Sequence, residues 1–242
     1  MSPDQRQGSA PGPPLITGAI LAGGQSRRLG QDKASLPLGG QPLALRAAEA
    51  LAPLVTACWL ITNQPLAHAA FGLPLVTDLR PWQGPAGGLL TALFFARTAW
   101  VLAVAVDNPF PAPALLAELA ARAGRTSRAA VVCRSPRDLE PFPGLYATRL
   151  LPKLQEFLRA DRRPTRFLEI CRPQIIPEAE VLALDPESRS FFNLNTPEDL
   201  ERAQAWLAGK SSRRDSADAD DIQGEKLSPA GTSGRTVSRG SS

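Results

Sequence analysis

The chain has 242 residues, of which 43% are hydrophobic and 21% are charged, and its formal net charge is +4. This length is enough for one substantial α/β core or at most two small domains. The weak positive charge, with no basic stripe interleaved with aromatic residues, argues against a nucleic-acid partner. No apolar run is long enough to cross a bilayer, so we expect no membrane association either.

The two ends of the chain differ in composition from its centre. Residues 1–14 lack the basic start and continuous apolar segment of a signal peptide, so we predict a disordered lead and a cytoplasmic location. Residues 209–242 contain almost no apolar side chains, and such a segment cannot bury enough surface to become ordered. We therefore predict a single domain over residues 15–208 with a disordered tail.

The first half of the chain alternates apolar strands with helices. Residues 16–20 form a short apolar run that predicts a first buried strand, and Leu21 to Lys33 follow it as a glycine-rich loop. Pro42 is suitably placed in the first turn of a helix that opens at Gln41. The remaining expected elements are two short strands, a loop, a helix and a very apolar strand, at 57–63, 74–78, 84–88, 89–99 and 100–106. Fully apolar strands separated by helices predict an α/β three-layer sandwich with a mostly parallel central sheet and a Rossmann-like, nucleotide-binding N-terminal half.

The second half has a less regular pattern. We expect a helix, a strand, a short antiparallel strand, two helices and two brief strands, at 112–123, 129–133, 145–147, 150–158, 164–170, 181–184 and 191–194. A final helix begins at Thr196 and Pro197, with Thr as its cap, and runs to about Leu207.

The cysteines and the histidine show no pattern typical of a catalytic or metal-binding site. The cysteines show no spacing typical of a disulfide framework or a zinc site, so we expect reduced thiols at Cys58, Cys133 and Cys171. The single histidine, His68, lies in an apolar stretch with no base partner nearby in sequence, and a surface or capping role is expected for it.

Polar elements follow several of the expected parallel strands. They are the glycine loop, Asn63, Asp78 and Asp107. Ligands of open α/β sheets sit outside the carboxyl ends of the strands, so these elements are expected to form one site.

The glycine loop has the composition of a phosphate site. Glycine lets the backbone approach a ligand closely, and consecutive N–H groups in such a turn form an anion-binding concavity. Arg28 and Lys33 add full positive charge. The spacing matches neither a Walker loop, which needs Lys-Ser/Thr directly after its last glycine, nor the G-x-G-x-x-G dinucleotide motif. The loop therefore predicts a polyphosphate ligand.

This loop, L-A-G-G-Q-S-R-R-L-G-Q-D-K, resembles the signature of the nucleotidyltransferases, and in particular of the molybdenum cofactor guanylyltransferases. Four further segments fit the same family in the same order, and the resemblance covers roughly residues 15 to 207: G-P-A-G-G at 84–88, V-D-N-P-F at 106–110, P-F-P-G-L-Y at 141–146 and F-N-L-N-T-P-E-D-L at 192–200. It implies transfer of GMP from GTP to the phosphate of molybdopterin, with release of pyrophosphate. Mg²⁺ is the implied cofactor, and the implied partners include molybdoenzyme maturation proteins.

The resemblance also assigns roles to residues. Lys33 would neutralise charge on the α-phosphoryl group, while Arg28 and the amides from Ala22 to Gly24 would hold the leaving pyrophosphate. Asp107 would hold Mg²⁺, which prefers carboxylate and phosphate oxygens. The implied nucleotide contacts are Leu21, Ala22, Gly23, Gly24, Lys33, Asn63, Asp78 and Asp107. Asn193 and Asn195 would face the metal or the acceptor phosphate, or would only cap the last helix.

Three other functions remain open at this point. They are a cytidylyltransferase that uses CTP for the same cofactor, a sugar-phosphate or polyol-phosphate nucleotidyltransferase, and a non-catalytic nucleotide-binding partner protein. The F-N-L-N-T-P segment favours the molybdenum branch, and Lys33 together with Asp107 favours an enzyme. Ala86 stands where the family commonly has Leu; with Gly87 and Gly88 it is expected to leave room for a purine base.

Overall fold

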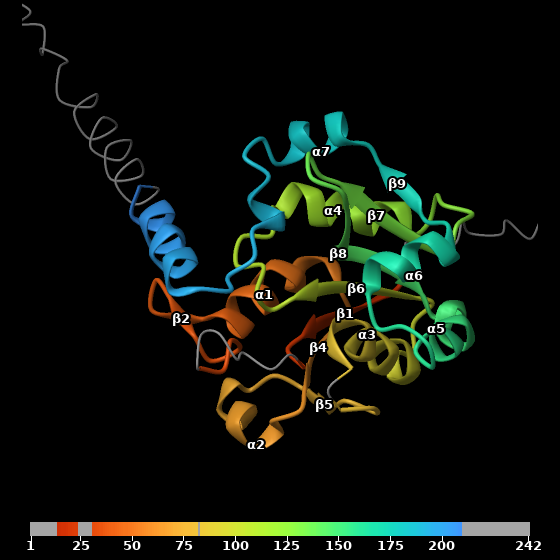
Figure 1. Ribbon diagram of the computed structural model, residues 1–242, viewed down its shortest axis with the longest axis horizontal. Helices are drawn as coiled ribbons and strands as arrows, with labels where there is room; N and C mark the ends of the chain where they lie inside the picture. The colour runs from red at the N-terminus through yellow and green to blue at the C-terminus, as the bar shows by residue number, and fades with distance from the viewer. Residues whose placement is uncertain (1–13, 24–30, 82, 210–242) are drawn as a thin grey trace, which may run out of the picture. The chain divides into compact units, whose positions relative to one another are not determined.

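The computed structural model describes residues 14–23, 31–81 and 83–209. A seven-stranded sheet forms the centre, in the order β5-β4-β1-β6-β8-β7-β9 (Figure 1). β8 runs antiparallel to both of its neighbours, and the remaining pairs are parallel. The strands are β1 (Ile16–Leu21), β4 (Ala57–Thr62), β5 (Leu75–Thr77), β6 (Trp100–Ala105), β7 (Ala130–Arg134), β8 (Leu139–Ala147) and β9 (Gln174–Ile176).

Helices cover both faces of this sheet (Figure 1). One layer contains α1 (Leu43–Leu51), α4 (Pro113–Arg122) and α7 (Glu178–Leu184), and α4 packs on both of the others. The other layer contains α3 (Gly84–Phe95), α5 (Leu151–Phe157) and α6 (Pro164–Cys171), and α5 packs between its neighbours. The predicted three-layer α/β fold with a mostly parallel sheet is confirmed.

Strands β1 and β6 are buried along their whole length. Parallel strands covered by helices on both faces need apolar side chains at every position, which is why these two runs were recognisable in the sequence. Thr17 is the polar exception in β1, and its hydroxyl is paired with that of Thr98 at 2.8 Å. From β1 the chain moves outward to β4 and β5, then returns to β6 on the other side of β1. This reversal places a topological switch point at the carboxyl ends of β1 and β6, where ligands of such sheets bind.

Short elements complete the described structure. They are the hairpin of β2 (Pro37–Leu38) and β3 (Gln41–Pro42), the helix α2 (Pro65–His68), and four 3-10 turns: η1 (Ala52–Leu54), η2 (Ala69–Phe71), η3 (Thr148–Leu150) and η4 (Arg189–Phe191). Gly39 and Gly40 join β2 to β3 with φ values of 61° and 80°, a conformation that favours glycine in a two-residue hairpin.

A last helix covers residues 197–209. Asp199 accepts hydrogen bonds from the amides of Asn195 and Thr196, and its own amide donates to the Thr196 hydroxyl at 3.2 Å. This is a reciprocal N-terminal cap, so the helix start predicted from Thr196 and Pro197 is confirmed. By its contacts the chain divides into a compact unit up to Ala203 and a second unit from Gln204.

The second half of the chain contains four errors of prediction. Residues 181–184 form the end of helix α7 rather than a strand, and 191–194 form the end of η4 and an irregular segment. The strand β9 was not expected, and β8 is six residues longer at its start than the predicted 145–147. In the first half, the expected loop at 84–88 is instead the beginning of α3, with Pro85 in its first turn, and α3 ends at Phe95 rather than residue 99.

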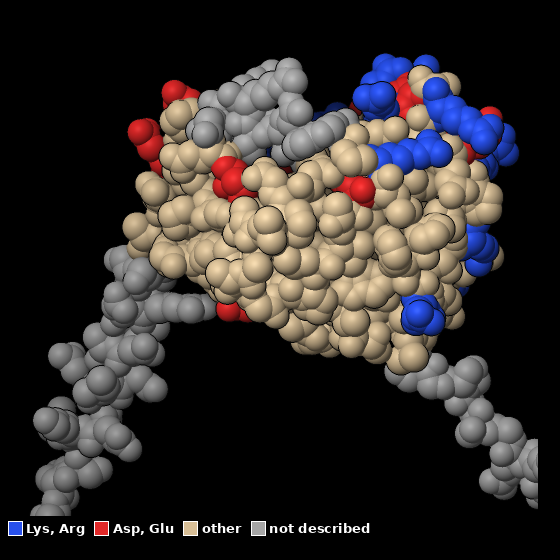
Figure 2. All heavy atoms as spheres, turned by 90° about the horizontal axis from the view of Figure 1, so that it is seen from below, with Lys and Arg blue, Asp and Glu red and all other residues tan. Residues whose placement is uncertain are grey.

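No helix among the described residues is both long and apolar enough to span a membrane. On the face seen in Figure 2 most side chains are uncharged, and Lys and Arg gather toward one side.

Candidate active site

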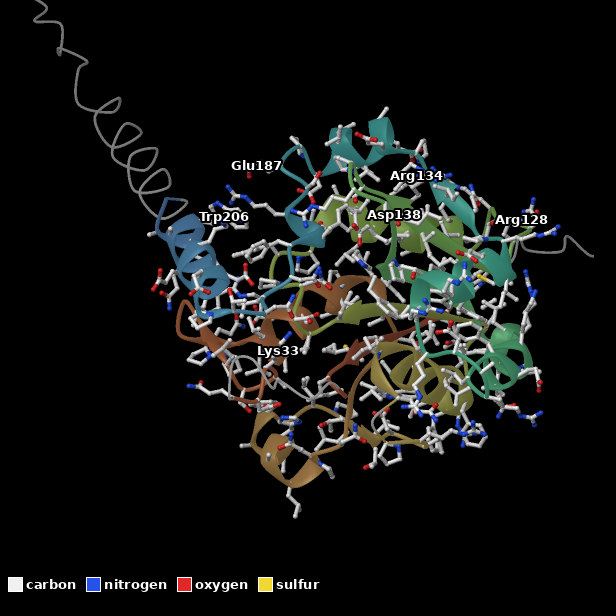
Figure 3. All side chains as sticks on the ribbon, viewed as in Figure 1. Lys33, Arg128, Arg134, Asp138, Glu187 and Trp206 are labelled. Atoms are coloured by element: carbon white, nitrogen blue, oxygen red, sulfur yellow. The ribbon has the colours of Figure 1, made fainter. Side chains whose placement is uncertain are left out.

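Lys33 is brought to Asp107 by a turn that follows the glycine loop. Its Nζ donates hydrogen bonds to Asp107 Oδ2 at 2.9 Å and to Asn195 Oδ1 at 2.7 Å. The side chains of Lys33 and Asp107 are only 17% and 26% exposed. Figure 3 shows Lys33 near the ends of the central strands. Three residues separated by more than 70 positions in sequence thus meet around one ammonium group.

Backbone bonds fix the surroundings of Asp107. The amide of Val106 donates to the carbonyl of Leu21 at 3.1 Å, which extends the pairing of β1 with β6 to the edge of the site. The amide of Leu194 donates to the carbonyl of Asp107 at 2.9 Å, so the 192–195 segment is held beside the end of β6. The Asn108 side chain lies 3.4 Å from both the Phe192 carbonyl and Asn193 Oδ1. The late segment of the chain is therefore part of this site.

A second polar cluster lies at the ends of β4 and β5. Asn63 Nδ2 donates to Asp78 Oδ2 at 2.9 Å and to the Gly23 carbonyl at 3.1 Å. The Thr91 hydroxyl of α3 lies 3.3 Å from Asp78 Oδ1. Asn63 Oδ1 is buried and has no hydrogen-bond partner within the part of the chain that the structure describes. An acceptor that is buried beside the loop backbone is suited to a hydrogen-bond donor on a ligand.

The environment of Asp78 perturbs its acidity. Burial raises the pKa of this carboxyl, and the hydrogen bonds from Asn63 and Thr91 lower it by less, so its pKa is raised overall from 3.8. A buried carboxylate with a raised pKa at the carboxyl ends of the strands is typical of a functional position.

The backbone at Gly23 lies close to the Asp78 carboxylate. A Cβ at this position would lie 2.4 Å from Asp78 Oδ2 and 3.3 Å from Asn63 Nδ2. Any side chain would displace the carboxylate, so glycine is required here by close approach. Gly88 has a related role, because a Cβ there would lie 3.3 Å from the Leu21 side chain.

The structure thus places the predicted residues in two groups. Lys33 and Asp107 meet with Asn195, while Gly23, Asn63 and Asp78 meet at the neighbouring strand ends, with Leu21 as the last residue of β1. Arg28 and Gly24 lie outside the described residues. Asn193 is exposed, and its Nδ2 lies 3.4 Å from the Phe191 carbonyl.

Two details of the predicted site need correction. The amide of Ala22 donates to the Ile61 carbonyl at 2.8 Å, so it does not point to a phosphate as expected. Ala86 is 1% exposed and belongs to the hydrophobic core, so its small size does not enlarge a base pocket. Of the three small residues, Gly88 is the one that packs beside Leu21 and Asp78.

His68 was also assigned wrongly, because it is fully buried rather than on the surface. Its Nε2 lies 2.7 Å from Asp32 Oδ2, and its Nδ1 lies 2.8 Å from the Thr62 hydroxyl. The position of Asp32 directly before Lys33 marks it as a residue near the site. Its pairing with His68 could not be expected from the sequence, because 36 residues separate the two.

The donor atoms at Asp107 fit a hard divalent cation. Carboxylate and amide oxygens from Asp107 and Asn195 face the same point, and such oxygens are the ligands that Mg²⁺ prefers. Within the described residues there is no cluster of three His, Cys, Asp or Glu side chains that would form a protein cage for a metal. This matches the usual Mg²⁺ site of phosphate chemistry, in which one or two carboxylates act together with phosphate oxygens and water.

A hollow of about 690 Å³ lies elsewhere, at the opposite end of β1, between η1 and α4. Its lining includes Leu15, Leu54, Val55 and Ala120 and contains none of the residues described above. The volume of a hollow therefore does not identify the site. The site is identified by the polar groups that converge at the ends of the strands.

Comparison with known proteins identifies the family to which the chain belongs. The family model of the MobA-like NTP transferase domain matches residues 18–177. The chain belongs to the MobA-like NTP transferase family. The match includes Lys33, Asn63, Asp78 and Asp107, and it confirms the family resemblance carried by the sequence motifs.

Relatives in this family match the chain over nearly their whole length. The molybdenum cofactor guanylyltransferase of Serratia proteamaculans is 37% identical, and the match covers 78% of this chain and 94% of the relative. That of Rhizobium meliloti is 35% identical, with 81% and 92% covered. The crystal structure of the molybdopterin-guanine dinucleotide biosynthesis protein A of Archaeoglobus fulgidus superimposes with a TM-score of 0.69 at 26% identity, and covers 80% of this chain and 99% of that one.

Proposed function

We propose that this protein transfers GMP from GTP to the terminal phosphate of molybdopterin, or of its molybdenum-bound form, and releases pyrophosphate. The observation that carries the proposal is the meeting of Lys33, Asp107 and Asn195 at the switch point of the sheet. The names of the relatives support guanine and molybdopterin as substrates. We place the reaction in the cytoplasm.

The reaction is an in-line displacement at the α-phosphorus. An oxygen of the acceptor phosphate bonds to this phosphorus, and the bond to the oxygen that bridges the α- and β-phosphates breaks, so that pyrophosphate leaves with the electron pair. Such transfers depend on positioning and on charge stabilisation rather than on a protein nucleophile.

In this mechanism Lys33 exchanges its protein partners for substrate. Without nucleotide its ammonium is neutralised by Asp107 and bonded to Asn195. With nucleotide, we infer that it binds the α-phosphoryl oxygens, where negative charge grows in the transition state. Asp107 and Asn195 would then hold Mg²⁺. The ion supplies charge neutralisation to the triphosphate when bound.

The second cluster would bind the nucleoside. Gly23 and Leu21 lie at the end of β1, and Asn63 offers a buried acceptor next to them. A buried group that hydrogen-bonds a substrate donor rejects analogues that lack it, because the group is then left unpaired. We therefore infer that the residues at the carboxyl ends of β1 and β4, together with α3, contact the base and contribute to nucleotide selection.

Pyrophosphate release by the purified protein tests this proposal. Each of the four nucleoside triphosphates is supplied with Mg²⁺, with and without molybdopterin. We expect turnover with GTP that depends on molybdopterin. Equal turnover with CTP would favour the cytidylyltransferase alternative, and no turnover with any nucleotide would favour the non-catalytic one.

A further inference from the structure

The buried His68 connects the turn that carries Lys33 to the end of β4. The side chain is at the end of the short helix α2 and is fully buried, stacked on Phe71 with ring centroids 5.4 Å apart. Both ring nitrogens are in hydrogen bonds, with Asp32 on one side and Thr62 on the other. It is also the single histidine of the chain.

Asp32 organises the turn itself. Its Oδ2 accepts from the amide of Ser35 at 2.9 Å and from the Ser35 hydroxyl at 2.7 Å, in addition to His68. The carbonyl of Lys33 accepts from the amide of Leu36 at 3.1 Å, which closes the same turn. Local bonds therefore fix the shape of the turn, and His68 is the contact that attaches Asp32 to a different part of the fold.

The hydrogen bonds determine where the imidazole carries its proton. An ionised carboxylate can only accept, so Nε2 of His68 carries a proton and donates it to Asp32 Oδ2 at 2.7 Å. In the neutral ring Nδ1 is then an acceptor, and it takes the hydrogen of the Thr62 hydroxyl, which itself accepts from the amide of Gln64 at 3.0 Å. With the neutral ring this arrangement satisfies every group in the row from Gln64 to Asp32.

We propose that His68 is a positioning residue for Lys33: its Nε2–H holds the Asp32 carboxylate, and with it the turn that directs the Lys33 ammonium to Asp107. The inference rests on the role proposed above for Lys33 at the α-phosphate. A misplacement of about 1 Å in a catalytic site costs about a hundred-fold in rate. Because Lys33 acts on charge that develops in the transition state, its misplacement lowers kcat more than it raises the KM for nucleotide.

Two substitutions distinguish the role of Nε2 from that of Nδ1. In His68→Gln the side-chain amide reaches the place of Nε2 and keeps a donor for Asp32. In His68→Asn the shorter amide reaches the place of Nδ1 and keeps a partner for Thr62. Both remove the stacked ring, so they should lower the melting temperature by similar amounts. Thr62→Val is a further control, since it removes the Thr62 contact and leaves Asp32 and His68 paired.

The proposal predicts unequal kinetics for this matched pair. We expect His68→Gln and Thr62→Val to retain kcat within about threefold, and His68→Asn to lose about tenfold or more with a smaller change in KM. Equal kcat values for the Gln and Asn variants would overturn the proposal, because a purely structural role does not distinguish the two nitrogens.

A measurement on the wild-type protein tests the contact without any assay of activity. Since the chain has one histidine, a long-range ¹H–¹⁵N spectrum contains one imidazole, and its ¹⁵N shifts report which nitrogen carries the proton. We expect a proton on Nε2 and a clear change of these shifts in Asp32→Asn. A ring that carries its only proton on Nδ1, or shifts that do not respond to Asp32→Asn, would overturn the proposal. If GTP and molybdopterin gave no turnover, the proposed function would fail while this spectrum still decided the contact.

Discussion

Gly23→Ala should damage the nucleotide site while leaving the fold intact. The new methyl group would lie 2.4 Å from Asp78 Oδ2, about 1 Å short of ordinary contact, which begins at 3.4 Å. The carboxylate must move by that distance, which breaks its 2.9 Å hydrogen bond with Asn63. A hydrogen bond to a charged group contributes about 1.5–3 kcal/mol. A shift of about 1 Å in a site costs about a hundred-fold in rate, which is close to 2.7 kcal/mol.

Steady-state kinetics with GTP and molybdopterin measure this effect. We expect kcat/KM for GTP to fall about a hundred-fold in Gly23→Ala. The melting temperature should fall by several degrees because of the lost hydrogen bond, and the protein should remain folded in the assay. Gly124→Ala is the matched control, because the same methyl group there meets only the Pro14 side chain in ordinary contact, at 3.5 Å from Cδ and 3.7 Å from Cγ. A kcat/KM within about threefold of wild type in Gly23→Ala would refute the reasoning, because Asp78 and Asn63 would then have no role in holding the nucleotide.

Three further changes have defined outcomes. Asp107→Asn keeps the shape but removes the charge, so turnover at ordinary Mg²⁺ concentrations should fall about a hundred-fold, and a Mg²⁺ titration of both proteins checks this; near-normal turnover would exclude Asp107 as the metal ligand. Burial raises the pKa of Asp32, but hydrogen bonds from Ser35 and His68 outweigh it and lower the pKa overall from 3.8. Ionised Asp32 therefore stabilises the fold above this value and the contribution is lost as the pH falls through the lowered pKa, so the difference in unfolding free energy between wild type and Asp32→Asn should be largest near neutral pH and vanish in acid. Truncation after Gly209 removes a segment with few apolar residues and should leave melting temperature and turnover unchanged, whereas a several-fold loss of activity would assign that segment a role at the site.

The central strands could be predicted because their environment imposes a simple pattern. β1 and β6 are covered on both faces, so nearly every position is apolar and the run is visible without knowledge of the partners. The polar residues at strand ends were located by the same logic. Lys33 and Asp107 could therefore be assigned to one site from sequence, although 74 residues separate them.

The second half lacked this pattern. The run 181–184 is too short for periodicity to separate strand from helix, and the signal that decides it lies outside the run, in Glu178 and Glu180 of the first helical turn. Pro141 and Pro143 lie inside β8. Proline cannot donate to the hydrogen bonds of a sheet, so the two residues argue against a strand at this position. Here β8 accommodates them where its register with β7 shifts, between Val132 and Cys133.

The role of His68 could not be predicted for a different reason. Its neighbours in sequence are apolar, and the group that explains it, Asp32, reaches it only through the packing of α2 against the turn. A buried polar side chain of this kind is defined by its tertiary partners. Sequence spacing gives no information about them.

The destination of labelled phosphate tests the central claim most directly. The purified protein is incubated with Mg²⁺, molybdopterin and GTP that carries its label in either the α- or the γ-phosphate, and the products are separated. If GMP is transferred, the α-label appears in a pterin dinucleotide of the expected mass and the γ-label appears in pyrophosphate. A γ-label in the pterin product, or α-label that remains in free guanosine nucleotides while GTP is consumed, would contradict the account.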